Sequence, residues 1–309
     1  MKSFKVLTAF ILILSLFVSG CSTMTVGNDK ISVVCTNFPV YDWVTEIVDG
    51  KYSDEFDVIL LGGNGDLHSY QPTAQDIATV QTCDLFVYVG GVSDGWTEAI
   101  FENNDIEALR LFDVLKDDLI CGNHEHDEHQ HKDEEYDEHI WLSPVMAKKA
   151  FDAVSEKLIQ LMPEAKEVFS ENAERCRERF DSIDEAYRNA VEESDDKTVV
   201  FADRFPFVYL TEEYGIDAVA AFRGCSADAD AGFEVIAQLA EAVDSFGKKT
   251  VLVLENSNET VAKTVIDSTK NKDVEIAVMN SCQTIDKNAT DSYFEIMESN
   301  LEALKKALE

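Results

Sequence analysis

Residues 144–193 read PVMAKKAFDAVSEKLIQLMPEAKEVFSENAERCRERFDSIDEAYRNAVEE, and after the first position only Pro163 interrupts their helical spacing. Apolar residues recur every three or four positions among lysine, arginine and glutamate, which is typical of long amphipathic helices. Strand-like patterns stand on both sides of this stretch and none lies within it. The sequence therefore predicts two lobes that are joined by helix.

Strands alternate with helices on both flanks of this stretch. Strands are expected at 31–36, 56–61 and 85–89 in the first flank, and at 198–201, 218–222, 250–254 and 276–279 in the second. The expected helices span 40–48, 76–81, 96–101, 209–214, 233–245, 262–269 and 292–308. The predicted fold is α/β, with small, mostly parallel sheets flanked by helices. Its parts are an N-terminal lobe at 31–144, a helical connector at 145–195 that includes the linking helix, and a C-terminal lobe at 196–309.

The amino terminus has the order of features of a secreted lipoprotein. Two lysines precede an apolar run at 6–18, which is too short to span a bilayer but suits the core of a signal peptide. Val-Ser-Gly-Cys at 18–21 then resembles the bacterial lipobox. We expect a signal peptide at 1–20, lipidation of Cys21, a tether at 21–30, and a body held on the extracytoplasmic face of a bacterial cell membrane. An ordinary cleaved signal with a coincidental cysteine is the alternative.

The chain is strongly acidic. Its 60 Asp and Glu residues against 26 Lys and Arg residues give a formal net charge of −34, and loss of two lysines with the signal peptide makes this −36. Such a surface repels nucleic acid and attracts cations without specifying which cation binds. We expect no nucleic-acid partner, and a monomeric body whose 45% hydrophobic residues suffice for two lobes.

Five of the six histidines fall between His124 and His139, and eight Asp or Glu residues stand among them. The segment 121–138 offers imidazoles, a thiol and carboxylates, which are donors that divalent ions such as Zn²⁺ accept. It has almost no apolar residues to bury, so we do not expect a rigid site within it. We interpret it as a metal-collecting loop, and the alternative is a solvated acidic loop with incidental histidines. Its collecting histidines are His124, His126, His129 and His131.

Two further sets of residues bear on metal chemistry. The sixth histidine, His68, stands just past the carboxyl end of a predicted strand, where open α/β sheets place ligands. Six cysteines follow Cys21 at wide spacing and without a CxxC pair, so their pairing stays open among fifteen connectivities. They are Cys35, Cys83, Cys121, Cys176, Cys225 and Cys282.

Three motifs carry a resemblance to a known family. They are Asn37-Phe-Pro-Val-Tyr-Asp-Trp43, Gly65-Asp-Leu-His-Ser-Tyr-Gln-Pro72 and Tyr136-Asp-Glu-His-Ile-Trp-Leu-Ser-Pro144. Essentially the whole mature chain resembles the solute-binding lipoproteins of metal-uptake ABC transporters, the cluster A-I group with zinc-binding ZnuA-like and manganese-binding members. The resemblance implies two α/β lobes joined by one long rigid helix, a metal site in the cleft between them, and an ABC permease as partner.

The resemblance also implies metal ligands, and His68 and His139 match the first two. The family's third ligand is a His or Glu ten residues before a Tyr-Gly pair, here Tyr214-Gly215, and Arg204 occupies that position. Arginine stays protonated and does not bind a cation through its side chain. Glu255, at the end of a predicted strand, is a tentative third ligand or the partner that neutralises Arg204. In the loop after the last strand, the strong donor is Cys282.

We therefore expect capture and delivery of a metal without covalent chemistry. The preferred ion is Zn²⁺, with Mn²⁺ or Fe²⁺ as alternatives, because two imidazoles with one or two oxygens suit all three. No catalytic residue is assigned and no enzyme is expected. Two other classes stay open: a surface metal buffer or cell adhesin that uses the acidic loop alone, and a zinc-dependent hydrolase with Glu255 and an activated water.

Overall fold

The first sheet holds four parallel strands in the order β2-β1-β3-β4. They are β1 (Ile31–Cys35), β2 (Phe56–Leu60), β3 (Leu85–Tyr88) and β4 (Ala108–Arg110). Three residues each of β1 and β3 are buried, as expected for strands that helices cover on both faces. The computed structural model describes residues 30–62, 67–102, 104–121, 136–223, 232–283 and 290–309.

The second sheet repeats this arrangement in the order β6-β5-β7-β8, again with parallel pairing throughout. Its strands are β5 (Thr198–Phe205), β6 (Asp217–Arg223), β7 (Thr250–Leu254) and β8 (Glu275–Met279). β7 is buried over its whole length. The register of β5 against β6 shifts between Phe201 and Arg204, and such a bulge turns the side chains that follow it.

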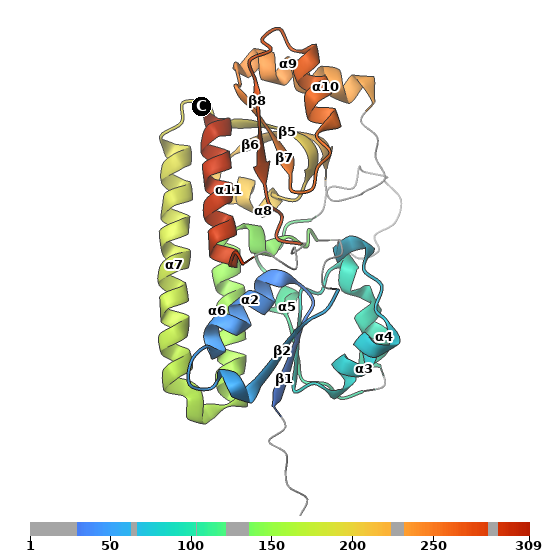
Figure 1. The fold of residues 1–309 in the computed structure, drawn as a ribbon, viewed down its shortest axis with the longest axis vertical. Helices are drawn as coiled ribbons and strands as arrows, with labels where there is room; N and C mark the ends of the chain where they lie inside the picture. The colour runs from blue at the N-terminus through green and yellow to red at the C-terminus, as the bar shows by residue number, and fades with distance from the viewer. Residues whose placement is uncertain (1–29, 63–66, 103, 122–135, 224–231, 284–289) are drawn as a thin grey trace, which may run out of the picture. The chain divides into compact units, whose positions relative to one another are not determined.

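Helices cover both sheets (Figure 1). Those of the first lobe are α2 (Phe38–Val48), α3 (Ala74–Thr82), α4 (Glu98–Phe101) and α5 (Leu111–Leu115), with 3-10 turns η2 (Ser53–Glu55), η3 (Leu67–Ser69), η4 (Val92–Thr97) and η5 (Ile140–Leu142). Those of the second lobe are α8 (Val208–Tyr214), α9 (Phe233–Phe246), α10 (Thr260–Ser268) and α11 (Tyr293–Leu308).

Two long helices connect the lobes. α6 (Pro144–Leu161) and α7 (Lys166–Glu192) run antiparallel, and the turn η6 (Pro163–Ala165) separates them at the predicted interruption (Figure 1). α7 has 27 residues and packs against α2 of the first lobe and against α8 and α11 of the second. It is therefore the linking helix, and the predicted α/β fold with two parallel sheets is confirmed.

The predicted elements are present with small shifts at their ends, and two additional ones appear. β4 and α5 have three and five residues, too few to show a hydrophobic period in the sequence. The helix predicted at 96–101 consists of the last two residues of the 3-10 turn η4 and the four residues of α4. Asp94 and Trp96 lie within the 3-10 turn η4.

Part of the predicted organisation lies outside the described residues. This holds for the signal peptide, for Cys21 and for the collecting histidines at 124–131. Five of the six cysteines that follow Cys21 are described, and all five are free thiols. In the part of the chain that the structure describes, no helix is both long and apolar enough to cross a membrane.

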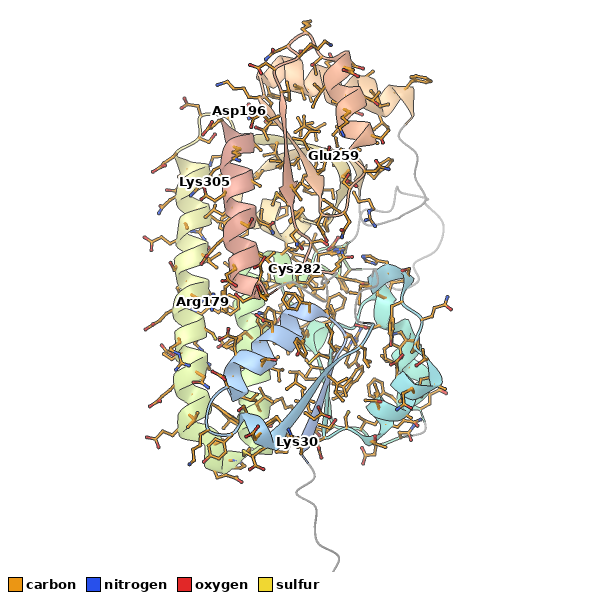
Figure 2. The ribbon with its side chains drawn as sticks, in the orientation of Figure 1. Lys30, Arg179, Asp196, Glu259, Cys282 and Lys305 are labelled. Atoms are coloured by element: carbon orange, nitrogen blue, oxygen red, sulfur yellow. The ribbon has the colours of Figure 1, made fainter. Side chains whose placement is uncertain are left out.

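One hydrophobic core runs from the first lobe into the second. Trp43 of α2 is fully buried within it, edge-on to Phe151 of α6, Phe180 of α7 and Tyr293 of α11, at centroid distances of 6.3, 6.0 and 5.3 Å. Arg179 of α7 places its guanidinium 4.1 Å from an aromatic ring of α11 (Figure 2). The C-terminal helix therefore ties the second lobe back to the first.

Asp42 of α2 carries a charge that burial makes costly. Desolvation raises its pKa to about 6, although its carboxylate accepts the backbone N–H of Tyr293 at 2.9 Å. The folded chain therefore holds this proton more tightly than the unfolded chain, and stability falls as the pH rises from about 4 to 6. Asp42→Asn removes the charge and keeps an acceptor. We expect this substitution to raise the free energy of unfolding at pH 7.5 by roughly 2–3 kcal/mol. This figure follows from the raised pKa of Asp42, because each pKa unit corresponds to about 1.4 kcal/mol.

Urea unfolding at pH 7.5 and pH 5 measures this gain, which is expected to shrink at the lower pH because the wild-type carboxyl is then largely protonated. Asp113→Asn makes the same change on a side chain that is 72% exposed, and serves as control. An equal gain in the control, or a gain for Asp42→Asn that persists unchanged at pH 5, would contradict the prediction.

Candidate metal centre

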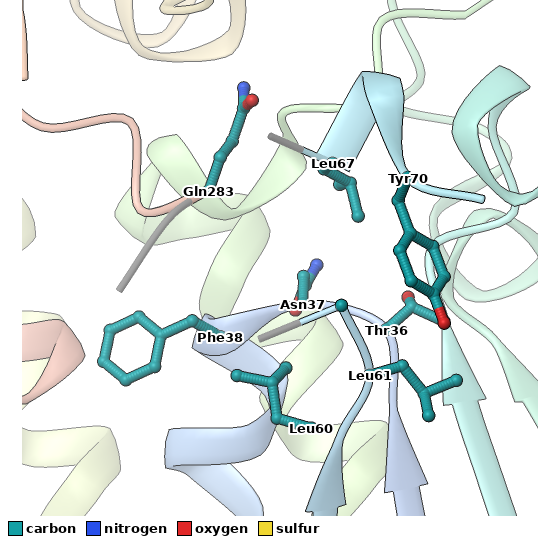
Figure 3. Close-up of a pocket in the computed structure, with 9 residues that line it drawn as sticks. Thr36, Asn37, Phe38, Leu60, Leu61, Leu67, Tyr70 and Gln283 are labelled. Atoms are coloured by element: carbon teal, nitrogen blue, oxygen red, sulfur yellow. The ribbon is translucent and has the colours of Figure 1, made fainter. Parts of the chain in front are cut away.

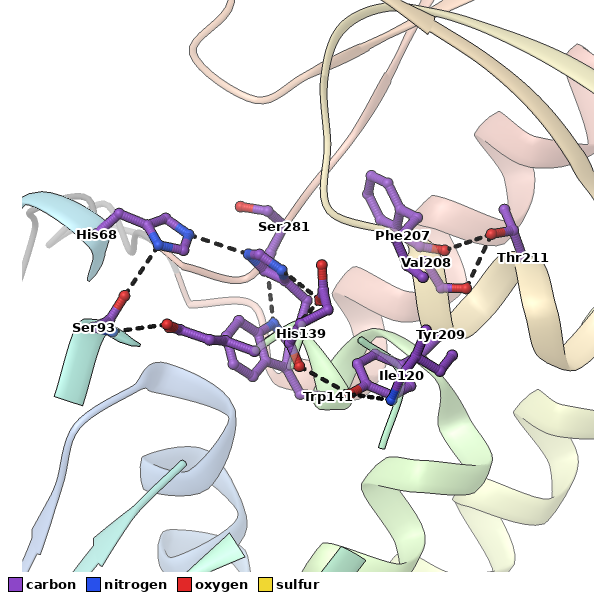
Figure 4. Close-up of polar contacts among 12 residues, drawn as sticks. His68, Ser93, Ile120, His139, Trp141, Phe207, Val208, Tyr209, Thr211 and Ser281 are labelled. Atoms are coloured by element: carbon purple, nitrogen blue, oxygen red, sulfur yellow. Dashed lines mark hydrogen bonds and ion pairs between the residues drawn. The ribbon is translucent and has the colours of Figure 1, made fainter. Parts of the chain in front are cut away.

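Two histidines from distant parts of the first lobe meet in the structure. His68 lies in η3, after β2, and His139 directly precedes η5. Their Nε2 atoms are 3.2 Å apart, although 71 residues separate them in the sequence (Figure 4). His139 is 2% exposed, whereas His68 is exposed to solvent. The fold thus brings together the two residues that the sequence predicts as ligands.

Each imidazole is held through its other nitrogen. Asp137 Oδ1 accepts both the backbone N–H of His139 and its Nδ1–H, each at 2.9 Å. Ser93 Oγ lies 3.0 Å from Nδ1 of His68 (Figure 4). Metal-binding histidines are oriented in this way by a second partner. Neither partner was predicted, although Asp137 stands only two residues before His139.

The turn that carries Ser93 is fixed by a buried carboxylate. Glu138 is 5% exposed and its Oε1 accepts the backbone N–H of Ser93 at 2.7 Å. A Cβ atom on Gly91 would lie 2.3 Å from Cγ of Glu138, so the close approach of the turn to this side chain requires glycine. The backbone of Ser93 is therefore fixed while its hydroxyl group can still rotate.

The second lobe also contacts the segment that carries His139. Tyr209 of α8 donates its hydroxyl hydrogen to the carbonyl of Asp137 at 2.8 Å and accepts the backbone N–H of Ile120 at 3.2 Å. Trp141 Nε1 donates to the carbonyl of Ser281 at 2.8 Å, in the loop after β8. The position of His139 therefore depends on both lobes.

Glu255, the tentative third ligand, is engaged by that same loop. Its carboxylate accepts the backbone N–H of Ser281 at 2.8 Å and also the Ser281 hydroxyl. Burial raises the pKa of Glu255, while the two bonds from Ser281 and the charge of Arg204 act in the opposite direction. The charge of Arg204 thus favours the ionised form of Glu255. Within the described residues, no three His, Cys, Asp or Glu side chains are grouped as metal donors.

Two other potential donors of the second lobe are occupied or protonated. Asp203 accepts the backbone N–H groups of Arg204 at 2.8 Å and of Leu254 at 3.4 Å, so its carboxylate serves the bulged end of β5. Cys282 is fully buried, and burial raises the pKa of its thiol well above the ordinary value. Metals bind the thiolate form, which this environment disfavours.

A small polar cavity lies next to η3 (Figure 3). Asn37 Oδ1 accepts the N–H of Val40 at the start of α2, which leaves Nδ2 as a donor that faces the cavity. This Nδ2, Thr36 Oγ1 and the hydroxyl of Tyr70 are buried and lack a hydrogen-bond partner among the described residues. The cavity has room for about one water molecule, which can form hydrogen bonds with these polar groups.

Comparisons with known proteins agree with this architecture. The family model of zinc-uptake complex component A, periplasmic (ZnuA), matches residues 33–307. The chain is similar to the zinc-binding lipoprotein AdcA of Streptococcus pneumoniae, with 30% identity over 301 residues that cover 94% of this chain and 58% of AdcA. It is also similar to the high-affinity zinc uptake system protein ZnuA of Bacillus subtilis, with 28% identity over 308 residues, 95% of this chain and 94% of that protein.

A solved structure shows the same likeness. The Zn(II)-bound ZnuA-like domain of Streptococcus pneumoniae AdcA has a TM-score of 0.72 and 28% sequence identity, and the match covers 90% of this chain and 98% of that domain. The chain thus spans 58% of the length of AdcA and matches nearly all of its ZnuA-like domain.

Proposed function

The chain belongs to the ZnuA family of zinc-uptake complex components, and from this premise we propose that it captures Zn²⁺ outside the cytoplasmic membrane and delivers it to an ABC permease. Zinc is the cargo in this proposal, and no residue has a catalytic role. The motifs that contain His68 and His139 support it, because they resemble those of the same family.

The spacing of the two histidines is the observation that carries the proposal. A tetrahedral zinc ion with Zn–N bonds of about 2.0–2.1 Å holds two ligating nitrogens roughly 3.3–3.4 Å apart. The two Nε2 atoms lie 3.2 Å apart, each on a ring whose Nδ1 has a hydrogen-bond partner. Little movement is therefore needed for both rings to bind one ion.

The remaining coordination positions differ from the family pattern. Arg204 stands where a third ligand is expected, and Glu255 would have to release Ser281 before it could bind zinc. We propose His68 and His139 as the protein ligands and water for the other positions, with Glu255 as a tentative ligand only after such a rearrangement.

The surroundings of the site support a route for the metal. Cys121 and Tyr136, at the base of the segment 121–138, pair in an isolated β-bridge close to His139 in the sequence. The acidic segment would therefore raise the local zinc concentration near His139. A lipid on Cys21 would hold the protein at the membrane where a permease receives the ion. The relatives that are named zinc-binding lipoprotein and zinc uptake system protein support both steps.

Zinc titration of the chain from Ser22 onward tests the proposal, since the compact unit begins at Ile31. Competition with a chromophoric chelator is expected to show one tight zinc site and several weaker ones, with weaker binding of Mn²⁺. Deletion of 123–135 is expected to remove only the weaker sites. If the tight site disappears with this deletion, the protein is a metal buffer that uses its acidic loop and the proposal is wrong.

A further inference from the structure

The second lobe holds the segment of His139 on both sides of that residue. On one side, Tyr209 of α8 donates its hydroxyl hydrogen to the carbonyl of Asp137 at 2.8 Å. On the other side, Trp141 donates its Nε1–H to the carbonyl of Ser281 at 2.8 Å (Figure 4). Tyr209, Trp141 and Ser281 are 2%, 1% and 3% exposed, so water has little access to these bonds. The two contacts therefore enclose a proposed zinc ligand.

Each of the two contacts leads directly to the ring of His139. Asp137, whose carbonyl accepts from Tyr209, places its Oδ1 atom 2.9 Å from Nδ1 of this ring. The indole of Trp141 packs edge-on against the imidazole, with the ring centroids 5.3 Å apart. Loss of either contact therefore loosens a residue that touches the imidazole itself.

Glu255 fixes the contact between Trp141 and Ser281. Its carboxylate accepts the backbone N–H of Ser281 at 2.8 Å and also the Ser281 hydroxyl, which holds the residue whose carbonyl accepts from Trp141. Tyr293 of α11 donates its hydroxyl hydrogen to the carbonyl of Trp141 at 2.7 Å. The second lobe thus holds both the side chain and the backbone of Trp141.

A metal ligand that is held in place before the ion arrives costs less to order on binding, so groups around it add to affinity without touching the metal. We propose that the second lobe contributes to zinc binding as a clamp on the segment of His139 and not as a source of ligands. The clamp consists of Tyr209 on one side and Ser281 on the other, with Glu255 as a positioning residue that acts through Ser281. This inference rests on the proposed function.

Zinc competition titration of Tyr209→Phe tests the first side of the clamp. This substitution removes one hydroxyl group and keeps the ring, and is expected to weaken zinc binding about fivefold, the effect of one ordinary hydrogen bond. Tyr214→Phe is the matched control, because its hydroxyl lies in the same helix and donates to Asp184 of α7 at 3.0 Å. It is expected to leave zinc affinity unchanged. Equal zinc affinities of the two variants would overturn the clamp.

A double-mutant cycle tests whether Glu255 acts through the clamp. Glu255→Gln keeps the length of the side chain and one acceptor oxygen, and Trp141→Phe keeps an aromatic ring but removes the Nε1–H. Each is expected to weaken zinc binding about fivefold, and the double variant is expected to bind little more weakly than either. Two losses that add in full would mean that Glu255 acts on zinc independently of Trp141, and would overturn its positioning role. Unchanged affinity in Glu255→Gln would overturn it as well.

Hydrogen exchange in the metal-free protein gives a readout that does not depend on zinc. The indole N–H signal of Trp141 is assigned by its absence in Trp141→Phe, and that of the buried Trp43 serves as internal reference. Glu255→Gln is expected to speed exchange at Trp141 more than at Trp43, because only Trp141 donates to Ser281. Equal changes at the two indoles would reflect a general change of stability and would overturn the local role of Glu255.

His139→Gln separates this inference from the proposed function. If the tight zinc site survives this substitution, zinc is not bound by His139, and the proposed function and the clamp are both wrong. If the tight site is lost in His139→Gln while Tyr209→Phe and Glu255→Gln bind zinc as the wild type does, only the clamp is overturned.

Discussion

Replacing His139 by alanine is expected to weaken zinc binding at the proposed site by more than about 100-fold, since loss of a mere hydrogen-bond partner of a metal ligand already costs about 10–100-fold. His139 supplies one of the two imidazole nitrogens of the proposed site, 3.2 Å from that of His68. Its ring is 2% exposed and bonded to Asp137, so its lone pair is aimed before zinc arrives. No second histidine of the described residues lies close enough to His68 to replace it.

Competition titration measures this loss, and His126→Ala is its matched control. It removes an imidazole from the acidic segment 121–138 and is expected to leave the tight site unchanged. His139→Gln, which is similar in volume and cannot bind zinc as an imidazole does, guards against a folding defect when its thermal unfolding matches that of the wild type. Equal losses in His139→Gln and His126→Ala would mean that the tight site includes the acidic segment, and would contradict the prediction.

The two sheets and the linking helix could be predicted because each leaves a local pattern. Buried strands such as β7 are short runs rich in β-branched residues, and α7 has helical spacing over its whole length. The return of α11 to the first lobe has no such pattern. It depends on contacts between distant residues, such as the bond from the N–H of Tyr293 to Asp42, which are 251 positions apart.

Of the candidate site, too, the sequence could predict only a part. His68 and His139 stand in motifs that a resemblance could identify, and the structure brings them together. Ser93 lies in a glycine-containing turn whose sequence does not indicate that it faces His68. Asp203 stands next to Arg204, and at the bulge in β5 its carboxylate accepts the backbone N–H groups of Arg204 and Leu254. No local pattern of the sequence indicates this role.

Glu255 shows why a candidate ligand cannot be chosen by residue type alone. Its place at the end of β7 made it a candidate ligand, and in the structure its carboxylate accepts hydrogen bonds from Ser281. What the sequence could not supply is the competition for its oxygens by the N–H and hydroxyl of a loop 26 positions away. Ser281 in turn accepts from Trp141, so Glu255 acts on the segment of His139 through two hydrogen bonds.

Trp43→Ala is expected to lower the free energy of unfolding by about 3–5 kcal/mol, the usual cost of removing a large buried aromatic side chain. Trp43 is fully buried where α2, α6, α7 and α11 meet, and its ring contacts Phe151, Phe180 and Tyr293. Single domains are stable by only about 5–15 kcal/mol, so this loss removes a large part of the total. The cavity would also loosen Tyr293, whose hydroxyl donates to the carbonyl of Trp141 at 2.7 Å.

Urea unfolding followed by circular dichroism measures the loss, and Trp43→Phe is its control. The Nε1–H of Trp43 has no hydrogen-bond partner among the described residues, so phenylalanine keeps most of the ring contacts and removes an unsatisfied donor. We expect Trp43→Phe to cost much less than Trp43→Ala. If both variants lose the same stability, the larger size of the indole, which phenylalanine does not fill, is what stabilises the junction. If neither loses more than about 1 kcal/mol, the typical effect of an average substitution, the four helices do not depend on this ring to hold the lobes together.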